Sequence, residues 1–134
     1  MPSDLIILSR ADGRPMYQQI VEQIRRLIAA GEWRPGHPLP SIRQLAVDLQ
    51  VSVITVKRAY FELELEGLIV TQHGKGSEVA SDPQVGVRVN ERDLTEHLEE
   101  AVRIAAILGM SPRQLQARLL EIANEFGLTG KKRA

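Results

Sequence analysis

Residues 39–76 read LPSIRQLAVDLQVSVITVKRAYFELELEGLIVTQHGKG, and this segment determines the expected fold. It predicts two helices separated by a tight turn, at about 41–49 and 52–66, because each begins at a serine and has apolar residues at helical spacing. Two β-rich runs follow, at 68–72 and 77–80, and the glycines between them permit a tight hairpin. This order is typical of a helix-turn-helix followed by a wing, an arrangement that binds DNA far more often than it performs catalysis.

Both helices carry recognisable start signals. Ser41 with Gln44 predicts a capping box, and Ser52 predicts a second N-cap with Thr55 in the first turn. The expected buried stripe of the second helix consists of Val56, Ala59, Tyr60 and Leu63. Its opposite side is also apolar, at Ile54, Phe61 and Leu65. We therefore expect this helix to be covered on two sides beyond its first turns.

The rest of the chain is arranged around this segment. Residues 1–80 are expected to form an N-terminal arm and the winged helix-turn-helix domain, 81–90 a linker, and 91–134 a two-helix segment with a basic tail. Apolar spacing predicts another helix at 16–30, before the helix-turn-helix. Its exposed face is expected to consist of Gln18, Gln19, Glu22, Gln23, Arg25 and Arg26. Trp33 is expected to anchor the proline-rich loop that follows on the core. The fold class is thus mainly α with a small β-hairpin.

The chain is electrically neutral, with 17 Lys and Arg residues against 17 Asp and Glu residues. Residues 1–80 contain nine basic and nine acidic side chains, and residues 81–134 contain eight of each. Affinity for DNA must therefore come from local placement of charge rather than from a basic protein surface. The placement is uneven, because basic residues lie near the first turns of the predicted helices, whereas glutamates crowd the far end of the second.

Composition limits the class of protein. There is no cysteine, which excludes disulfides, zinc-thiolate sites and cysteine nucleophiles. His37, His73 and His97 match no metal-ligand spacing, and no nucleophile, base or cofactor loop forms a catalytic constellation. No apolar run is long enough for a signal core or a membrane span. We expect a soluble, cytoplasmic, nucleoid-associated protein that uses no cofactor and is not an enzyme.

The N-terminal end of the second helix is the strongest candidate binding surface. Its free N–H groups and partial positive charge suit phosphate. Ser52 and Thr55 add hydroxyl groups, and Lys57 and Arg58 add cations one turn later. Taken alone, these residues fit an ordinary cap and solvated cations better than a binding site. Within the helix-turn-helix and wing order, DNA binding is favoured, because these first turns enter the major groove.

Arg43 and the hairpin loop are further candidates. Arg43 lies beside Ser41 and can contact a backbone phosphate or a guanine edge. In the loop, Gly74 permits close approach to the sugar-phosphate backbone, and His73 or Lys75 can enter the minor groove. An ordinary hairpin turn is the alternative for the loop, and a P-loop is excluded by spacing.

The two C-terminal helices are amphipathic and too few to enclose a ligand pocket. Their apolar stripes require cover from the N-terminal domain or from the same helices of a second copy. A symmetric dimer is the favoured arrangement, because such dimers read two DNA half-sites about one helical turn apart. The expected dimerisation residues are Leu94, Leu98, Val102, Ala105, Leu108, Leu115, Leu119, Ile122 and Phe126.

Several motifs in order resemble the GntR family of bacterial transcription regulators. They are YQQI in the first helix, W-x-PG-x-PLPS-x-R-x-LA, VS-x-x-TV-x-RA, EL-x-x-EGLI and the HGKG wing. The resemblance covers about 15–80, and the short two-helix tail is similar to the YtrA subfamily, whose members dimerise through those helices. It implies DNA contacts by Ser41, Arg43, Ser52, Thr55, Lys57, Arg58, His73, Gly74 and Lys75. Val53 and Ile54 replace the polar or Arg residues common in the family and suit thymine methyl groups instead.

The expected function is a homodimeric repressor of transcription that occupies a palindromic operator in double-stranded DNA. The resemblance also implies control by a small molecule, although the residues identify no effector. The alternative, from another class, is a winged-helix adaptor that binds a protein partner without specific DNA binding.

Overall fold

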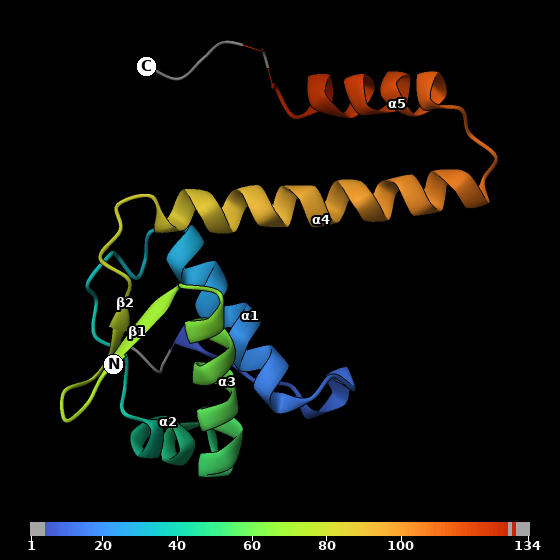
Figure 1. Ribbon diagram of the computed structural model, residues 1–134. Helices are drawn as coiled ribbons and strands as arrows, with labels where there is room; N and C mark the ends of the chain where they lie inside the picture. Colours follow the sequence, from blue (N-terminus) through green and yellow to red (C-terminus); the bar gives the residue numbers. More distant parts are fainter. Residues whose placement is uncertain (1–4, 129, 131–134) are drawn as a thin grey trace. The chain divides into compact units, whose positions relative to one another are not determined.

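The computed structural model describes residues 5–128 and residue 130, and within them the fold is mainly helical with one β-hairpin (Figure 1), which confirms the predicted fold class. The elements are a short 3-10 helix (Arg10–Asp12), α1 (Met16–Ala29), α2 (Ile42–Leu49), α3 (Val53–Leu65), β1 (Ile69–Gln72), β2 (Gly76–Val79), α4 (Val85–Ile107) and α5 (Pro112–Glu125). The chain divides into an N-terminal unit, Met1–Glu91, and a C-terminal unit, Arg92–Ala134. The basic tail at 131–133 lies outside the described residues.

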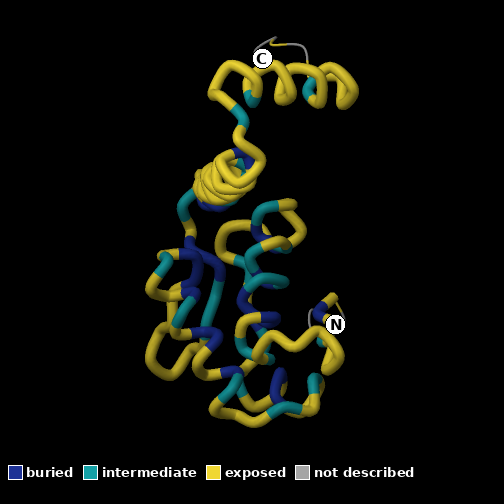
Figure 2. Tube along the Cα trace, turned by 90° about the vertical axis from the view of Figure 1, so that its right-hand side faces the viewer, coloured by how far each residue is buried: buried dark blue, intermediate teal, exposed yellow. Residues whose placement is uncertain are grey.

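The core belongs to the N-terminal unit, where α1, α2, α3 and the hairpin meet (Figure 2). Helix α1 packs against α3, and each contributes a stripe of apolar side chains at helical spacing. The predicted stripe of α3 is fully buried, which confirms it. Trp33 is also buried and stacks on His37, so the proline-rich loop is anchored on the core as predicted.

Two N-caps begin the helices of the helix-turn-helix. The Ser41 hydroxyl accepts a hydrogen bond from the Gln44 amide at 3.1 Å, but the Gln44 side chain donates to Asp48 instead of back to Ser41. Only half of the predicted capping box is therefore present. Ser52 caps α3 as predicted, by accepting from the Thr55 amide at 3.1 Å. Between the helices Gln50 takes the left-handed conformation, with φ 55°, which makes the turn tight.

The wing is an antiparallel pair in which Ile69 lies opposite Val79 and Gln72 opposite Gly76. Gly74 and Gly76 have φ of 80° and 86°, values that favour glycine over residues with a side chain. The proline-rich loop runs beside β2, because His37 and Val79 are joined by a 2.8 Å backbone hydrogen bond. Core, loop and wing are thus linked by backbone hydrogen bonds.

The predicted linker is helical from Val85 onward, so its assignment to 81–90 is wrong for most of its length. Asp82 lies just before α4, and its carboxylate accepts from the Gln84 amide at 2.8 Å, next to the first residue of the helix. Val85 and Val89 are 1% and 2% exposed and belong to the core of the N-terminal unit. Gly86 allows this packing, since a Cβ there would lie 3.3 Å from the Ile28 carbonyl oxygen.

Two expectations about exposure are also wrong. The second apolar side of α3 is uncovered in the described structure, and Ile54 is 78% exposed, with Phe61 and Leu65 exposed as well. Conversely, Gln19, placed on the exposed face of the first helix, is only 2% exposed. Both expectations, for α3 and for α1, came from helical periodicity alone. Periodicity does not show that the segment before α1 covers part of that helix.

Candidate DNA-binding surface

The first turn of α3 combines a helix N-terminus with two hydroxyl groups. The Ser52 and Thr55 hydroxyl oxygens are 2.7 Å apart, and Ser52 also accepts from the Thr55 backbone amide. The other amides of this turn have no partner within the helix, and their dipoles give the end a partial positive charge. This end of α3 can therefore accept an anionic or polar edge of a ligand.

Lys57 and Arg58 follow this turn and have different surroundings. Lys57 is exposed. The Arg58 guanidinium lies over the Tyr17 ring, 3.8 Å from its centroid, and donates to the Tyr17 hydroxyl at 3.1 Å. This contact joins α3 to the start of α1 and fixes the direction of the Arg58 side chain. The Lys57 side chain is thus less constrained than that of Arg58, which Tyr17 holds.

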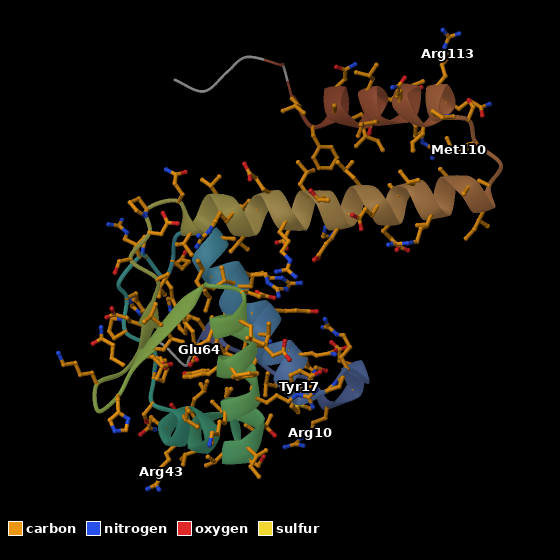
Figure 3. All side chains as sticks on the ribbon, in the orientation of Figure 1. Arg10, Tyr17, Arg43, Glu64, Met110 and Arg113 are labelled. Atoms are coloured by element: carbon orange, nitrogen blue, oxygen red, sulfur yellow. The ribbon has the colours of Figure 1, made fainter. Side chains whose placement is uncertain are left out.

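Arg43 is exposed in the first turn of α2, where Figure 3 shows it directed away from the other helices. The start of α2 is fixed from behind, because the buried Tyr60 hydroxyl donates to the Pro40 carbonyl at 2.7 Å. Burial also raises the pKa of Tyr60 well above its ordinary value, so this donor stays protonated. The backbone at the start of α2, which carries Ser41 and Arg43, is therefore held in place by Tyr60.

The wing residues His73, Gly74 and Lys75 are all exposed. The Lys75 amide donates to the Gln72 carbonyl at 2.9 Å and closes the loop. The side chains of His73 and Lys75 lie outside this backbone hydrogen bond. In the view of Figure 1, α2 lies between the hairpin loop and the N-terminal end of α3. The nine predicted site residues all lie in the N-terminal unit, on α2, α3, their caps and the wing loop.

Two carboxylates at the other end of α3, Glu64 and the C-cap Glu66, have partners within the N-terminal unit. Glu66 pairs with Arg25 of α1, and both side chains are largely buried. Glu64 accepts a hydrogen bond from Thr71 of the wing. These groups lie three turns from Ser52, so they add little repulsion to an anion bound at the start of α3.

Sequence reasoning missed Arg10. Its guanidinium donates to the Gln50 carbonyl at 3.3 Å, in the turn between α2 and α3, across 40 residues of sequence. No local pattern could reveal this contact. Among residues 5–128 and 130 there is no group of three or more His, Asp or Glu side chains able to hold a metal ion. None of the described helices is both long and apolar enough to cross a membrane.

Comparison with known proteins agrees with this geometry. Residues 16–79 match the family described as bacterial regulatory proteins, gntR family. The chain is 30% identical over 120 residues to the HTH-type transcriptional repressor YtrA of Bacillus subtilis (strain 168), across 89% of this chain and 92% of that protein. It is also 30% identical over 102 residues to the uncharacterized HTH-type transcriptional regulator YhcF of the same organism, across 76% of this chain and 84% of that protein.

Solved structures show the same relationship. A GntR family transcriptional regulator from Listeria monocytogenes is 30% identical with a TM-score of 0.70, covering 82% of this chain and 96% of that one. YtrA from Sulfolobus acidocaldarius, a GntR-family transcription factor, is 37% identical with a TM-score of 0.60, covering 74% of this chain and 98% of that one. The chain therefore belongs to the GntR family of bacterial regulatory proteins, as a YtrA-like DNA-binding transcription regulator and not an enzyme.

Proposed function

We propose that the protein is a homodimeric repressor that binds a palindromic operator in double-stranded DNA through α2, α3 and the wing. The observation that carries the proposal is the exposed N-terminal end of α3, where Ser52 and Thr55 stand beside free backbone amides and the exposed Lys57. A repressor role is supported by the name of the Bacillus subtilis relative, which covers nearly all of this chain. Such a protein acts on the bacterial chromosome, in the cytoplasm.

Each predicted residue has a role in this proposal. Ser41, Ser52 and Thr55 contact phosphate through hydroxyl and amide groups at helix N-termini. Arg43 and Lys57 contact phosphate or guanine. Arg58 contacts phosphate from the side of α1, because Tyr17 holds its guanidinium there. The wing residues His73, Gly74 and Lys75 approach the minor groove.

Val53 and Ile54 give the reading helix an apolar component. They are 46% and 78% exposed at the first two positions of α3. Such side chains cannot hydrogen-bond a base edge, but they can contact a thymine methyl group in the major groove. The proposal therefore includes thymines in each half-site.

The dimer is supported by the apolar side chains that α4 and α5 leave exposed. Seven of the nine predicted dimerisation residues are exposed: Leu94, Leu98, Val102, Leu108, Leu119, Ile122 and Phe126. The other two differ, because Ala105 is buried within the chain and Leu115 is half-buried. Leaving this much apolar surface in water is unfavourable by about 25 cal/mol per Å². A second copy would cover it and would hold two reading heads for two half-sites.

A mobility-shift assay on the DNA upstream of the protein's own gene tests the function. We expect a specific complex that weakens steeply with salt. Changing Arg43 and Lys57 together to Ala should abolish it, whereas Arg26→Ala, at the exposed end of α1, should leave it intact. A specific complex that survives the double change would refute the proposed reading face. No specific complex with any duplex would favour the protein-binding adaptor instead.

A further inference from the structure

The segment from Ile7 to Ser9, before α1, is bonded by two glutamines of that helix. The buried Gln19 side chain accepts from the Ser9 amide at 2.8 Å and donates to the Ser9 carbonyl at 2.9 Å. Gln23, one turn later on α1, bonds both backbone groups of Ile7 in the same way. Residues at i and i+4 of one helix thus bind alternate residues of an extended segment. The side-chain amides of Gln19 and Gln23 bond the backbone of this segment as a neighbouring strand would.

This segment leads directly into Arg10. The guanidinium of Arg10 donates to the Gln50 carbonyl at 3.3 Å, two residues before the Ser52 cap of α3. In Figure 3, Arg10 and Arg43 lie on either side of the N-terminal end of α3. One N–H group of the guanidinium is used by Gln50, and the remaining donors of this exposed side chain are available to a ligand.

Within the part of the chain that the structure describes, no carboxylate neutralises Arg10. Asp12, the closest in sequence, binds Arg14 through both of its oxygens, at 2.7 and 2.6 Å. Arg14 also pairs with Glu22. Among the carboxylates of the described residues, none forms an ion pair with Arg10. The two arginines of the arm therefore differ: Arg14 pairs with Asp12 and Glu22, whereas no carboxylate of the described residues pairs with Arg10.

We propose that Arg10 is a further DNA contact, which binds a backbone phosphate beside the major groove that α3 enters. The inference rests on the proposed function and extends its surface to the arm. In this motif the second helix lies in the major groove and the first helix crosses the DNA backbone. A cation beside the turn between them therefore lies close to a DNA backbone that flanks the groove. Gln19 and Gln23 are positioning residues, since they place the arm before DNA is bound.

The test is fluorescence anisotropy of an operator duplex over a range of KCl concentrations. We expect Arg10→Ala to weaken binding and to lower the slope of log affinity against log salt by about 0.9 for each protomer that loses a phosphate contact. Arg10→Gln should behave like Arg10→Ala, because it keeps a donor for Gln50 but loses the charge. The matched control is Arg26→Ala, which removes an exposed arginine at the far end of α1 and should leave the slope unchanged.

The outcomes separate a phosphate contact from a structural role. If Arg10→Gln keeps the wild-type slope and affinity, Arg10 acts only through Gln50 and the inference is overturned. A loss confined to the operator and absent from a scrambled duplex would also overturn it, since a phosphate contact weakens both equally. Gln23→Ala should reproduce part of the Arg10→Ala defect while circular dichroism still shows a folded protein. If the wild-type protein forms no specific complex, the proposed function fails rather than this inference.

Discussion

At the scale of single residues, Ser52 has two roles that can be separated. It caps α3 by accepting from the Thr55 amide, and its hydroxyl lies at the proposed DNA surface. Ser52→Ala should lower the free energy of unfolding by about 1 kcal/mol through loss of the cap. Ser52→Asp keeps a capping oxygen, so thermal unfolding should return close to wild type.

DNA binding should respond differently to the same two changes. The aspartate adds a negative charge where phosphate is expected, so Ser52→Asp should bind the operator more weakly than Ser52→Ala even though it is more stable. Anisotropy and thermal melts on the same samples measure both quantities. If affinity follows stability across the two variants, Ser52 is a cap alone.

Residue-scale prediction from sequence succeeded where the signal is local. The caps at Ser41 and Ser52 depend on residues three positions apart, and both are present. It failed for Gln19 and Arg10, whose partners lie 10 and 40 residues away. Helical spacing assigns Gln19 to the exposed face, and nothing in the local sequence indicates that an extended segment covers it.

At the scale of secondary-structure elements, α4 is where sequence and structure differ most. Residues 81–90 are expected from the sequence to form a linker, and they include Pro83 and Gly86, residue types that are typical of loops. In the structure, Pro83 precedes the helix, and Gly86 lies within it, where a Cβ would make a tight 3.3 Å contact with the Ile28 carbonyl oxygen. The four-residue spacing of Val85 and Val89 was the available signal, but two valines are too few to establish a helical stripe. The helix-turn-helix and hairpin were predictable because each contains several independent signals.

The place of α4 in the core can be tested with two valines of the same stretch. Val89 is 2% exposed and Val87 is 49% exposed. Val89→Ala should lower the free energy of unfolding by about 2 kcal/mol, because it removes buried methyl groups and leaves a cavity. Val87→Ala should change it by less than about 0.5 kcal/mol. Urea denaturation measures both, and equal effects would mean that this stretch is a linker after all.

At the scale of the whole molecule, neutrality and DNA binding are compatible because charge is sorted by position. Glu66 pairs with Arg25, Asp12 of the arm pairs with Arg14, and Glu64 accepts a hydrogen bond from Thr71. The cations at the proposed surface, Lys57 and Arg43, are exposed. We expect one reading head with so few contacts to bind with modest affinity, so the proposed dimer would supply tight operator binding through two heads acting together.

The proposed dimer therefore has a measurable consequence for DNA binding. Leu98 is 42% exposed in the middle of the predicted apolar stripe of α4. Leu98→Glu places a charge in the proposed interface, so size-exclusion chromatography with light scattering should report one chain instead of two. Affinity for the full operator should fall by at least about 100-fold, because each head then binds alone. Affinity for an isolated half-site should stay at the wild-type value. Gln116→Glu adds the same charge at an exposed position of α5 outside the predicted stripe and should remain dimeric. A wild-type protein that elutes as one chain, or a monomeric variant with full operator affinity, would contradict the dimer.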